Sequence, residues 1–193
     1  MSTVVLGADV LYNLETSSGG SLVLNSLGCE VLVSSIVMVK HGLDLSTRSS
    51  DRLIPGLEGS GLPTLKVVEM SQEALVIFLE FVRAPYLESI DDSSASAIAT
   101  AVVCGNTCLA VDDLKVRRLC SERFPEIRLL STVDLLRKAL CFSGGIADDL
   151  RVCLKSMIEV SRMPILGKDR EWVECFLLEG GYVAEAGIRV IRD

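Results

Sequence analysis

The sequence predicts an α+β protein in which strands occupy the front of the chain and helices follow. Two observations lead to this class. The stretch "LPTLKVVEMSQEALVIFLEFVRAPY" reads as a short strand that passes into an amphipathic helix across Ser71. From about residue 95 onward, apolar residues recur mainly at helical spacing, interrupted by Pro and Gly. Strands that come first and helices that come later are typical of the α+β class.

The first predicted unit is an N-terminal β-hairpin. The β-prone runs "DVLYNLE" and "SLVLNSL" are separated by "TSSGG", where Gly19 and Gly20 can take a positive φ. The apolar stretch that follows predicts a helix over residues 29–39. Residues 46–63 contain four Ser, three Gly and two Pro, and we expect a loop there.

The next unit is the strand "TLKVVEM" and its helix. Ser71 can accept a hydrogen bond from the first free N–H groups of the helix, and Glu73 suits its positive end. Arg83 and Pro85 close the helix. One face carries apolar residues at i, i+3, i+4 and i+7: Leu75, Phe78, Leu79 and Val82.

Helices account for the rest of the predicted chain. Ser131 and Asp134 form a capping-box pattern ahead of "TVDLLRKALCF". The expected helices are an Ala-rich one over 95–108, then 112–124, the helix that the capping box opens, 147–162 and 169–179.

Charge and composition exclude several classes of protein. With 49% hydrophobic residues the chain is not a disordered one. The net charge is −7, which repels phosphate backbones, and the cluster Lys115, Arg117 and Arg118 beside Asp112 and Asp113 is more typical of a solvated helix face. We therefore expect no nucleic-acid partner.

Membrane insertion and secretion are not expected either. The uncharged run over residues 93–111 contains several Ser and Thr, which is too polar for a span and indicates a buried helix. The seven Cys are scattered and odd in number, and no basic region opens the chain. Reduced thiols in a cytoplasmic or nuclear protein are the expectation.

The candidates for catalytic or metal-binding residues have simpler explanations. The single His, His41, could pair with a Cys as a nucleophile, but an exposed residue at a helix end is the favoured interpretation. Cys104 and Cys108 fall at i, i+4 and could ligate a metal, yet no further ligands lie nearby and core packing is favoured. We expect no enzyme, no cofactor and no metal.

Acidic pairs and glycines lead to the same expectation. The pairs 91–92, 112–113 and 148–149 each stand where a helix is predicted to begin, and carboxylates favour the positive end of a helix. The glycines over residues 56–61 fit neither nucleotide-binding pattern.

The order of elements resembles that of BTB/POZ domains over residues 7–124. The segments that carry the resemblance are "ADVLYNLE", "SLVLNSL", "CEVLVSSIVMV", "TLKVVEMSQEALVIFLEFVRAPY", "ASAIATAVVCGNTCL" and "VDDLKVRRLCSERF". The resemblance implies a hairpin and short mixed sheet against a helical cluster. Residues 125–193 then resemble the helical extension that follows such domains in cullin adaptors, packed on the first part.

The resemblance implies a non-enzymatic protein–protein interaction module. It would act as an adaptor that links a partner to a cullin ubiquitin ligase, or as a self-associating assembly subunit. A homodimer would use the hairpin and residues 29–39, whereas a cullin would meet residues 86–92 and 112–124. The residues implied for partner binding are Val31, Met38, Tyr86, Leu87, Lys115 and Arg118. The alternatives are a thiol enzyme built on His41 and a Cys, and a monomeric linker that shares the fold.

Overall fold

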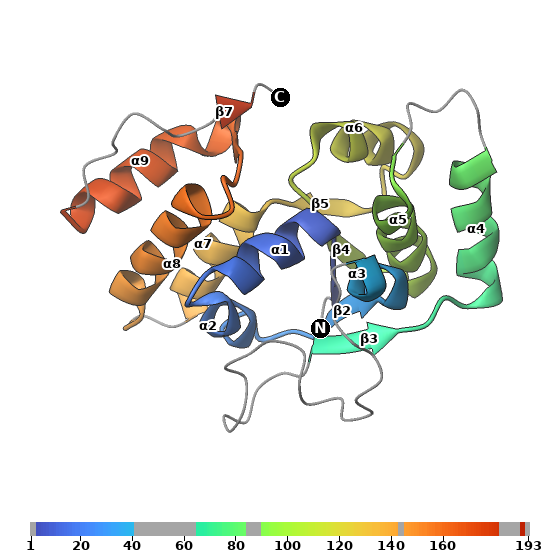
Figure 1. Ribbon diagram of the computed structural model, residues 1–193, viewed down its shortest axis with the longest axis horizontal. Helices are drawn as coiled ribbons and strands as arrows, with labels where there is room; N and C mark the ends of the chain where they lie inside the picture. The colour runs from blue at the N-terminus through green and yellow to red at the C-terminus, as the bar shows by residue number, and fades with distance from the viewer. Residues whose placement is uncertain (1–2, 41–64, 84–89, 143–144, 182–189, 192–193) are drawn as a thin grey trace.

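A five-stranded parallel sheet forms the centre of the protein. The structure is a computed structural model that describes residues 3–40, 65–83, 90–142, 145–181 and 190–191. The strand order is β3-β2-β1-β4-β5, so the first strand lies in the middle (Figure 1). The strands are β1 (Thr3–Leu6), β2 (Val31–Ser34), β3 (Leu65–Val68), β4 (Thr107–Ala110) and β5 (Arg128–Leu130).

Neighbouring residues of β1 serve two different cores. Val4 and Leu6 face a core shared with the first two helices and the last three, whereas Val5 faces a core built with the middle helices. The first group is α1 (Ala8–Thr16), α2 (Gly20–Asn25), α7 (Thr132–Phe142), α8 (Ala147–Glu159) and α9 (Arg170–Glu179). The second group is α4 (Gln72–Arg83), α5 (Asp92–Cys104) and α6 (Leu114–Arg123). Burial on both faces explains why the central strands are almost wholly apolar.

The predicted N-terminal hairpin is wrong, because its two segments form α1 and α2. Val10, Leu11 and Leu14 are fully buried, and their spacing suits one face of a helix. Gly20 serves close packing: a Cβ there would lie 2.0 Å from the carbonyl oxygen of Leu14. Packing of the apolar face therefore overrides the β propensity of the segment.

Two predicted helices are each shorter than expected and adjoin a strand. The stretch over 29–39 divides into β2 and α3 (Ser35–Lys40). The Ala-rich helix ends at Cys104, where Gly105 has a φ of 56°, and β4 follows. Cys104 and Cys108 therefore lie on different elements, so the expectation that one helix face carries both is wrong.

The sheet continues past the predicted boundary at residue 124. β5 pairs with β4 through Cys108–Arg128, Leu109–Leu129 and Ala110–Leu130. Residues 125–193 also contain β6 (Ile165–Leu166), which pairs with β7 (Val190–Ile191) in a separate two-stranded sheet. Residues before and after 124 thus share one sheet and one core.

Other expectations are confirmed. The protein contains both strands and helices, and β3 leads into α4, whose N-terminus receives the predicted cap because the amide of Ala74 donates to Ser71 Oγ at 3.2 Å. The capping box of α7 is present in both directions, through Ser131 N to Asp134 Oδ2 and Asp134 N to Ser131 Oγ. Within the described ranges no helix has the length and apolar character that a bilayer crossing requires.

Candidate docking site at the carboxyl edge of the sheet

The carboxyl ends of β1, β4 and β5 bring together residues that are far apart in the sequence. Asp9 stands in the first turn of α1, Asp112 follows β4, and Thr132 begins α7 after β5. In open parallel sheets this edge is where ligands usually bind, because side chains from successive loops converge there.

Asp9 is bound by the backbone of the chain itself. Its Oδ2 accepts the amide of Asp112 at 2.7 Å and that of Asp113 at 2.9 Å, and its Oδ1 accepts the amide of Val10 at 2.9 Å. Burial raises the pKa of Asp9, although these three amides act in the opposite direction. The carboxylate joins the start of α1 to the turn after β4.

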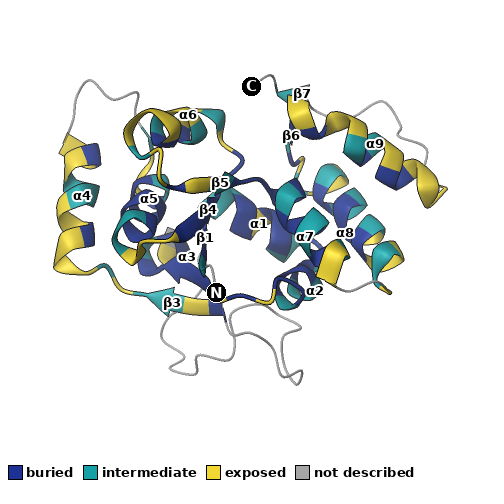
Figure 2. Cartoon of the chain, turned by 180° about the vertical axis from the view of Figure 1, so that it is seen from behind, coloured by how far each residue is buried: buried dark blue, intermediate teal, exposed yellow. Residues whose placement is uncertain are grey.

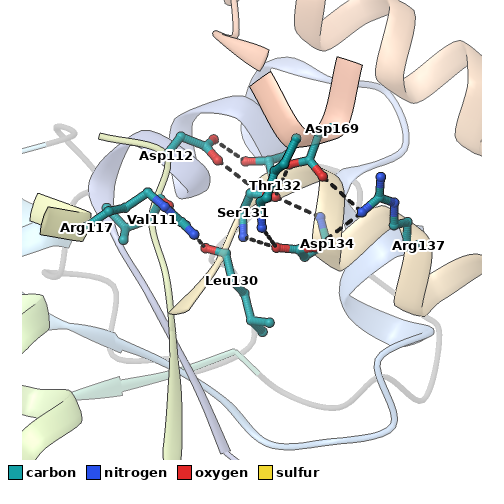
Figure 3. Close-up of polar contacts among 10 residues, drawn as sticks. Val111, Asp112, Arg117, Leu130, Ser131, Thr132, Asp134, Arg137 and Asp169 are labelled. Atoms are coloured by element: carbon teal, nitrogen blue, oxygen red, sulfur yellow. Dashed lines mark hydrogen bonds and ion pairs between the residues drawn. The ribbon is translucent and has the colours of Figure 1, made fainter. Parts of the chain in front are cut away.

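Asp112 is almost completely buried and joins three elements, and Figure 3 shows its contacts with Thr132. Its Oδ1 accepts the amide of Thr132 at 2.8 Å, and its Oδ2 accepts Thr132 Oγ1 at 2.5 Å and Asn13 Nδ2 at 3.0 Å. Burial, with the nearby charge of Asp9, raises the pKa of Asp112 to about 7. Hydrogen bonds from Thr132 offset part of this effect.

A second polar group lies beside the first, between α7 and the turn before α9. Asp169 is fully buried; its Oδ2 accepts Ser131 Oγ at 3.0 Å and its Oδ1 is 2.9 Å from Arg137 Nη1. Lys168 Nζ approaches Asp134 Oδ2 at 3.2 Å. Burial alone would raise the pKa of Asp134, but hydrogen bonds from Ser131 and Lys168 lower it below its ordinary value.

Asp9, Asp112 and Asp134 therefore all accept hydrogen bonds from the chain itself. Within the part of the chain that the structure describes, no group of three or more His, Cys, Asp or Glu side chains is arranged to hold a metal ion. The sequence predicts the pair Asp112–Asp113 at the start of a helix, and only Asp113 has that role. Asp113 caps α6, since its Oδ1 accepts the amides of Lys115 and Val116, whereas Asp112 turns inward to Thr132.

A cavity of about 530 Å³ lies next to this edge, beside α6. Arg117 crosses from α6 to the strand ends, because its Nη1 donates to the carbonyl oxygens of Val111 at 2.8 Å and Leu130 at 3.0 Å (Figure 3). Four cationic side chains, one hydroxyl and two leucines line the cavity: Lys115, Arg117, Arg118, Lys168, Ser121, Leu114 and Leu129. The cavity is thus apolar in its walls and positively charged around them.

Two other cationic side chains of the cavity, Arg118 and Lys168, remain partly exposed to solvent although each pairs with a carboxylate. Arg118 Nε is 2.9 Å from Glu122 Oε1 with 80% of the Arg side chain exposed, and Lys168 pairs with Asp134. Such exposed pairs contribute little to stability. An incoming anion can therefore compete with Glu122 for Arg118.

The predicted partner-binding residues fall into three groups: exposed, buried and outside the described residues. Lys115 and Arg118 are exposed and both line the cavity. Val31 and Met38 are 1% and 0% exposed, so their assignment to a dimer surface is wrong: they belong to the core. Tyr86 and Leu87 lie outside the described residues, as does His41, the candidate residue of the thiol-enzyme alternative.

Two residues of the cavity, Leu129 and Lys168, have no signal in the sequence that would connect them to α6. They come from β5 and from the 3-10 helix Gly167–Asp169, and the fold brings them next to Arg117. The resemblance implies Lys115 and Arg118 for partner binding, whereas the basic cluster over 115–118 by itself favours a solvated helix face.

The thiols offer little support for a nucleophile. Burial raises the pKa of four of the seven Cys, that of Cys120 to about 12: Cys29, Cys104, Cys120 and Cys153. A raised pKa lowers the fraction of thiolate, which is the reactive form.

Comparison with known proteins provides no family. No family model matches the chain, and no curated protein matches it. Among solved structures, a chain from the crystal structure of VapBC2 from Rickettsia felis bound to a DNA fragment from their promoter is 17% identical. The match covers 67% of this chain and 98% of that one, with a TM-score of 0.40. A similarity of this degree supports no inference about fold or function.

Proposed function

We propose that the protein is a non-enzymatic interaction module that holds an acidic segment of a partner protein in the cavity beside α6. The observation that carries this proposal is the gathering of four cations around an apolar cavity in a chain whose net charge is −7. Complementary charge steers a partner to a surface and fixes its orientation there.

The hydrogen bonds to these carboxylates support the non-enzymatic part of the proposal. A general acid, a general base or a metal ligand needs at least one free oxygen directed at the substrate. Asp9 and Asp112 accept three hydrogen bonds each from the chain. Their arrangement therefore suits a structural connection between the elements that border the cavity.

The lining of the cavity favours a protein segment over a nucleic acid. Of the described residues that line it, none is aromatic, whereas sites for single-stranded nucleic acids combine basic groups with aromatic platforms. Leu114 and Leu129 suit apolar side chains that accompany Asp or Glu in a peptide. The overall negative charge also opposes a long polyanion.

The BTB-type version of this role would place a cullin on α6. The resemblance that implies a cullin opens with a hairpin, and that segment forms α1 and α2 instead. We therefore propose the interaction class together with the surface on α6, and a cullin is one protein to test there.

A binding experiment with defined probes tests the proposal. The probe is a fluorescent peptide of Glu and Leu, compared with a Lys and Leu peptide and with a single-stranded oligonucleotide of equal charge. The double variant Lys115→Glu/Arg118→Glu should weaken binding of the acidic peptide at least about tenfold. The matched control, Lys66→Glu/Lys155→Glu, changes two exposed lysines on β3 and α8 and should bind as the wild type does.

Two results would overturn the proposal. One is equal binding of the acidic peptide by the two double variants. The other is tighter binding of the oligonucleotide than of the peptide, which would make the cavity a nucleic-acid site.

A second candidate function is hydrolysis that depends on a divalent metal ion. The proximity of the two carboxylates Asp9 and Asp112 favours it. Buried carboxylates with raised pKa values at the carboxyl edge of a sheet are typical of functional sites. Metal binding would require Asp112 to leave Thr132 and Asn13. We expect Mn²⁺ to leave the melting temperature unchanged; a rise that Asp112→Asn abolishes would favour this candidate instead.

A further inference from the structure

The helix α6 presents one face to the cavity, and Arg117 lies on that face. The opposite side of α6 is buried through Val116 and Cys120, whereas the remainder reaches the surface of the molecule (Figure 2). Four residues at positions i, i+3, i+4 and i+7 of the helix line the cavity together: Leu114, Arg117, Arg118 and Ser121. Arg117 is therefore placed between an apolar residue and a hydroxyl on the side that a ligand would meet.

The chain holds the guanidinium group of Arg117 in one orientation. Its Nη1 donates to the carbonyl oxygens of Val111 and Leu130, which belong to the ends of two neighbouring strands. Arg118 and Lys115 are exposed, and their side chains have no comparable attachment to the sheet in the part of the chain that the structure describes. A donor group that is already fixed loses less freedom when a ligand binds to it.

The fixed orientation leaves one edge of the guanidinium group open. The group is planar, so the edge formed by Nε and Nη2 points in the direction opposite to Nη1, away from the strand ends. Among the described residues, no acceptor meets either nitrogen, and neither is a buried atom without a partner. Both nitrogens therefore reach solvent, at a residue that lines the cavity.

This open edge matches the shape of a carboxylate. Two parallel N–H groups can donate to its two oxygens, which is the strongest and most specific form of the Arg–carboxylate pair. The buried carboxylate of Asp112 does not fill this role. The charge of Arg117 acts on it against the larger effect of burial, which raises the Asp112 pKa, but its oxygens accept donors from Asn13 and Thr132.

We propose that Arg117 fixes one Asp or Glu side chain of the partner segment through a bidentate pair on Nε and Nη2. This inference rests on the acidic-segment function proposed above, and it adds the residue that sets the position of the segment. Lys115 and Arg118 attract the segment by charge, whereas Arg117 determines which carboxylate lies at the strand ends.

The number of cations favours a side-chain carboxylate over the carboxylate at a chain end. A peptide has one terminal carboxylate, but four cationic side chains line the cavity. A segment with several acidic residues can place one carboxylate on Arg117 and others near Lys115 and Arg118. Leu114 and Leu129 then contact the apolar residues between them.

A position-by-position exchange in the peptide tests this role. The probe is a fluorescent peptide of Glu and Leu, amidated at its C-terminus, with the Glu residues unevenly spaced so that it has one register. In each further peptide a single Glu is replaced by Gln. The wild-type protein should bind one of these peptides at least about tenfold more weakly, because one carboxylate loses its charged hydrogen bonds. The other exchanges should have much smaller effects.

Variants of the protein assign the sensitive position to Arg117. Arg117→Lys keeps the charge and removes the open edge, so it should no longer distinguish the sensitive Gln peptide from its parent. The matched control Arg118→Lys should keep that distinction. Circular dichroism establishes that both variants are folded, and the comparison of peptides on the wild type does not depend on them.

The outcomes separate this inference from the proposed function. Equal losses for all the Gln peptides would overturn the role of Arg117 and leave the acidic-segment function in place, as would a sensitive position that persists in Arg117→Lys. Tighter binding of a Gln and Leu peptide with a free C-terminus would overturn the side-chain assignment. No binding of the parent peptide would overturn the function and the inference together.

Discussion

Asn13 Nδ2 donates to Asp112 Oδ2 at 3.0 Å, although the two residues are 99 positions apart in the chain. The same oxygen accepts Thr132 Oγ1 at the start of α7. One buried carboxylate therefore connects the first helix, the end of β4 and α7. The free energy of unfolding should depend on how this carboxylate titrates.

We expect the protein to become less stable as the pH rises from about 4 to about 7. The pKa of Asp112 is raised from 3.8 to about 7 in the folded protein, so the folded state holds a proton that the unfolded chain releases. Its contribution is complete below 3.8 and is lost as the pH rises through about 7. The slope from this group approaches about 1.4 kcal/mol per pH unit. Urea unfolding at a series of pH values measures it.

The variant Asp112→Asn should reduce this slope to the part that Asp9 contributes through its own raised pKa, whereas Asp148→Asn should keep the full slope, because the Asp148 side chain is 93% exposed. Asp134 contributes the opposite dependence, since its lowered pKa adds stability that is lost as the pH falls below its ordinary range. A slope of unchanged size in Asp112→Asn would show that another group causes it.

Arg117 and Arg118 are neighbours that should differ sharply in their effect on stability. Arg117→Met leaves the carbonyl oxygens of Val111 and Leu130 without their guanidinium donor, and we expect a loss of about 1–3 kcal/mol. Arg118→Met removes an exposed ion pair with Glu122 and should change stability by less than about 1 kcal/mol. Chemical denaturation of the two variants measures both values. Equal losses would contradict the role given to Arg117.

Gly20 should not tolerate a side chain. A Cβ at this position would lie 2.0 Å from the carbonyl oxygen of Leu14, so Gly20→Ala must displace α2 from α1. We expect a loss of about 3 kcal/mol or more, at the upper end for overpacking. The control is Gly145→Ala, which meets nothing within 4 Å. Thermal unfolding compares the two, and similar melting temperatures would contradict the close approach.

Alkylation should divide the thiols by exposure. Cys141 and Cys175 are exposed and should react with iodoacetamide first. Cys120 and Cys153 are fully buried, and burial raises the pKa of both thiols, so they should react after unfolding alone. Peptide mass spectrometry of the native protein follows each site. Rapid alkylation of Cys120 or Cys153 would favour the thiol-enzyme alternative.

The sequence predicts the elements that carry their own local signals. The α4 helix is correct at both ends, because Ser71 caps it and Arg83 precedes the proline that cannot continue it. The capping box of α7 involves residues three positions apart, and it forms as predicted. Such signals depend on neighbouring residues, so they persist whatever the rest of the fold does.

The missed elements depend on distant parts of the chain. β4 reads "TCLA" and is buried on both faces, so it shows no alternation that would separate it from the Ala-rich helix before it. The contact between Asp9 and the turn after β4 requires that β1 and β4 be parallel neighbours, which no local pattern specifies. The cavity also depends on distant parts of the chain, because Lys168 lies next to α6 only in the folded protein.

The central place of β1 also determines when the chain can fold during synthesis. β1 precedes both of its partners in the chain, since it pairs with β4 through Ala110 on one side and with β2 on the other. Its hydrogen bonds stay incomplete until β4 (Thr107–Ala110) has been made. A nascent chain thus exposes the apolar residues of β1 throughout that interval, when binding by a chaperone competes with aggregation.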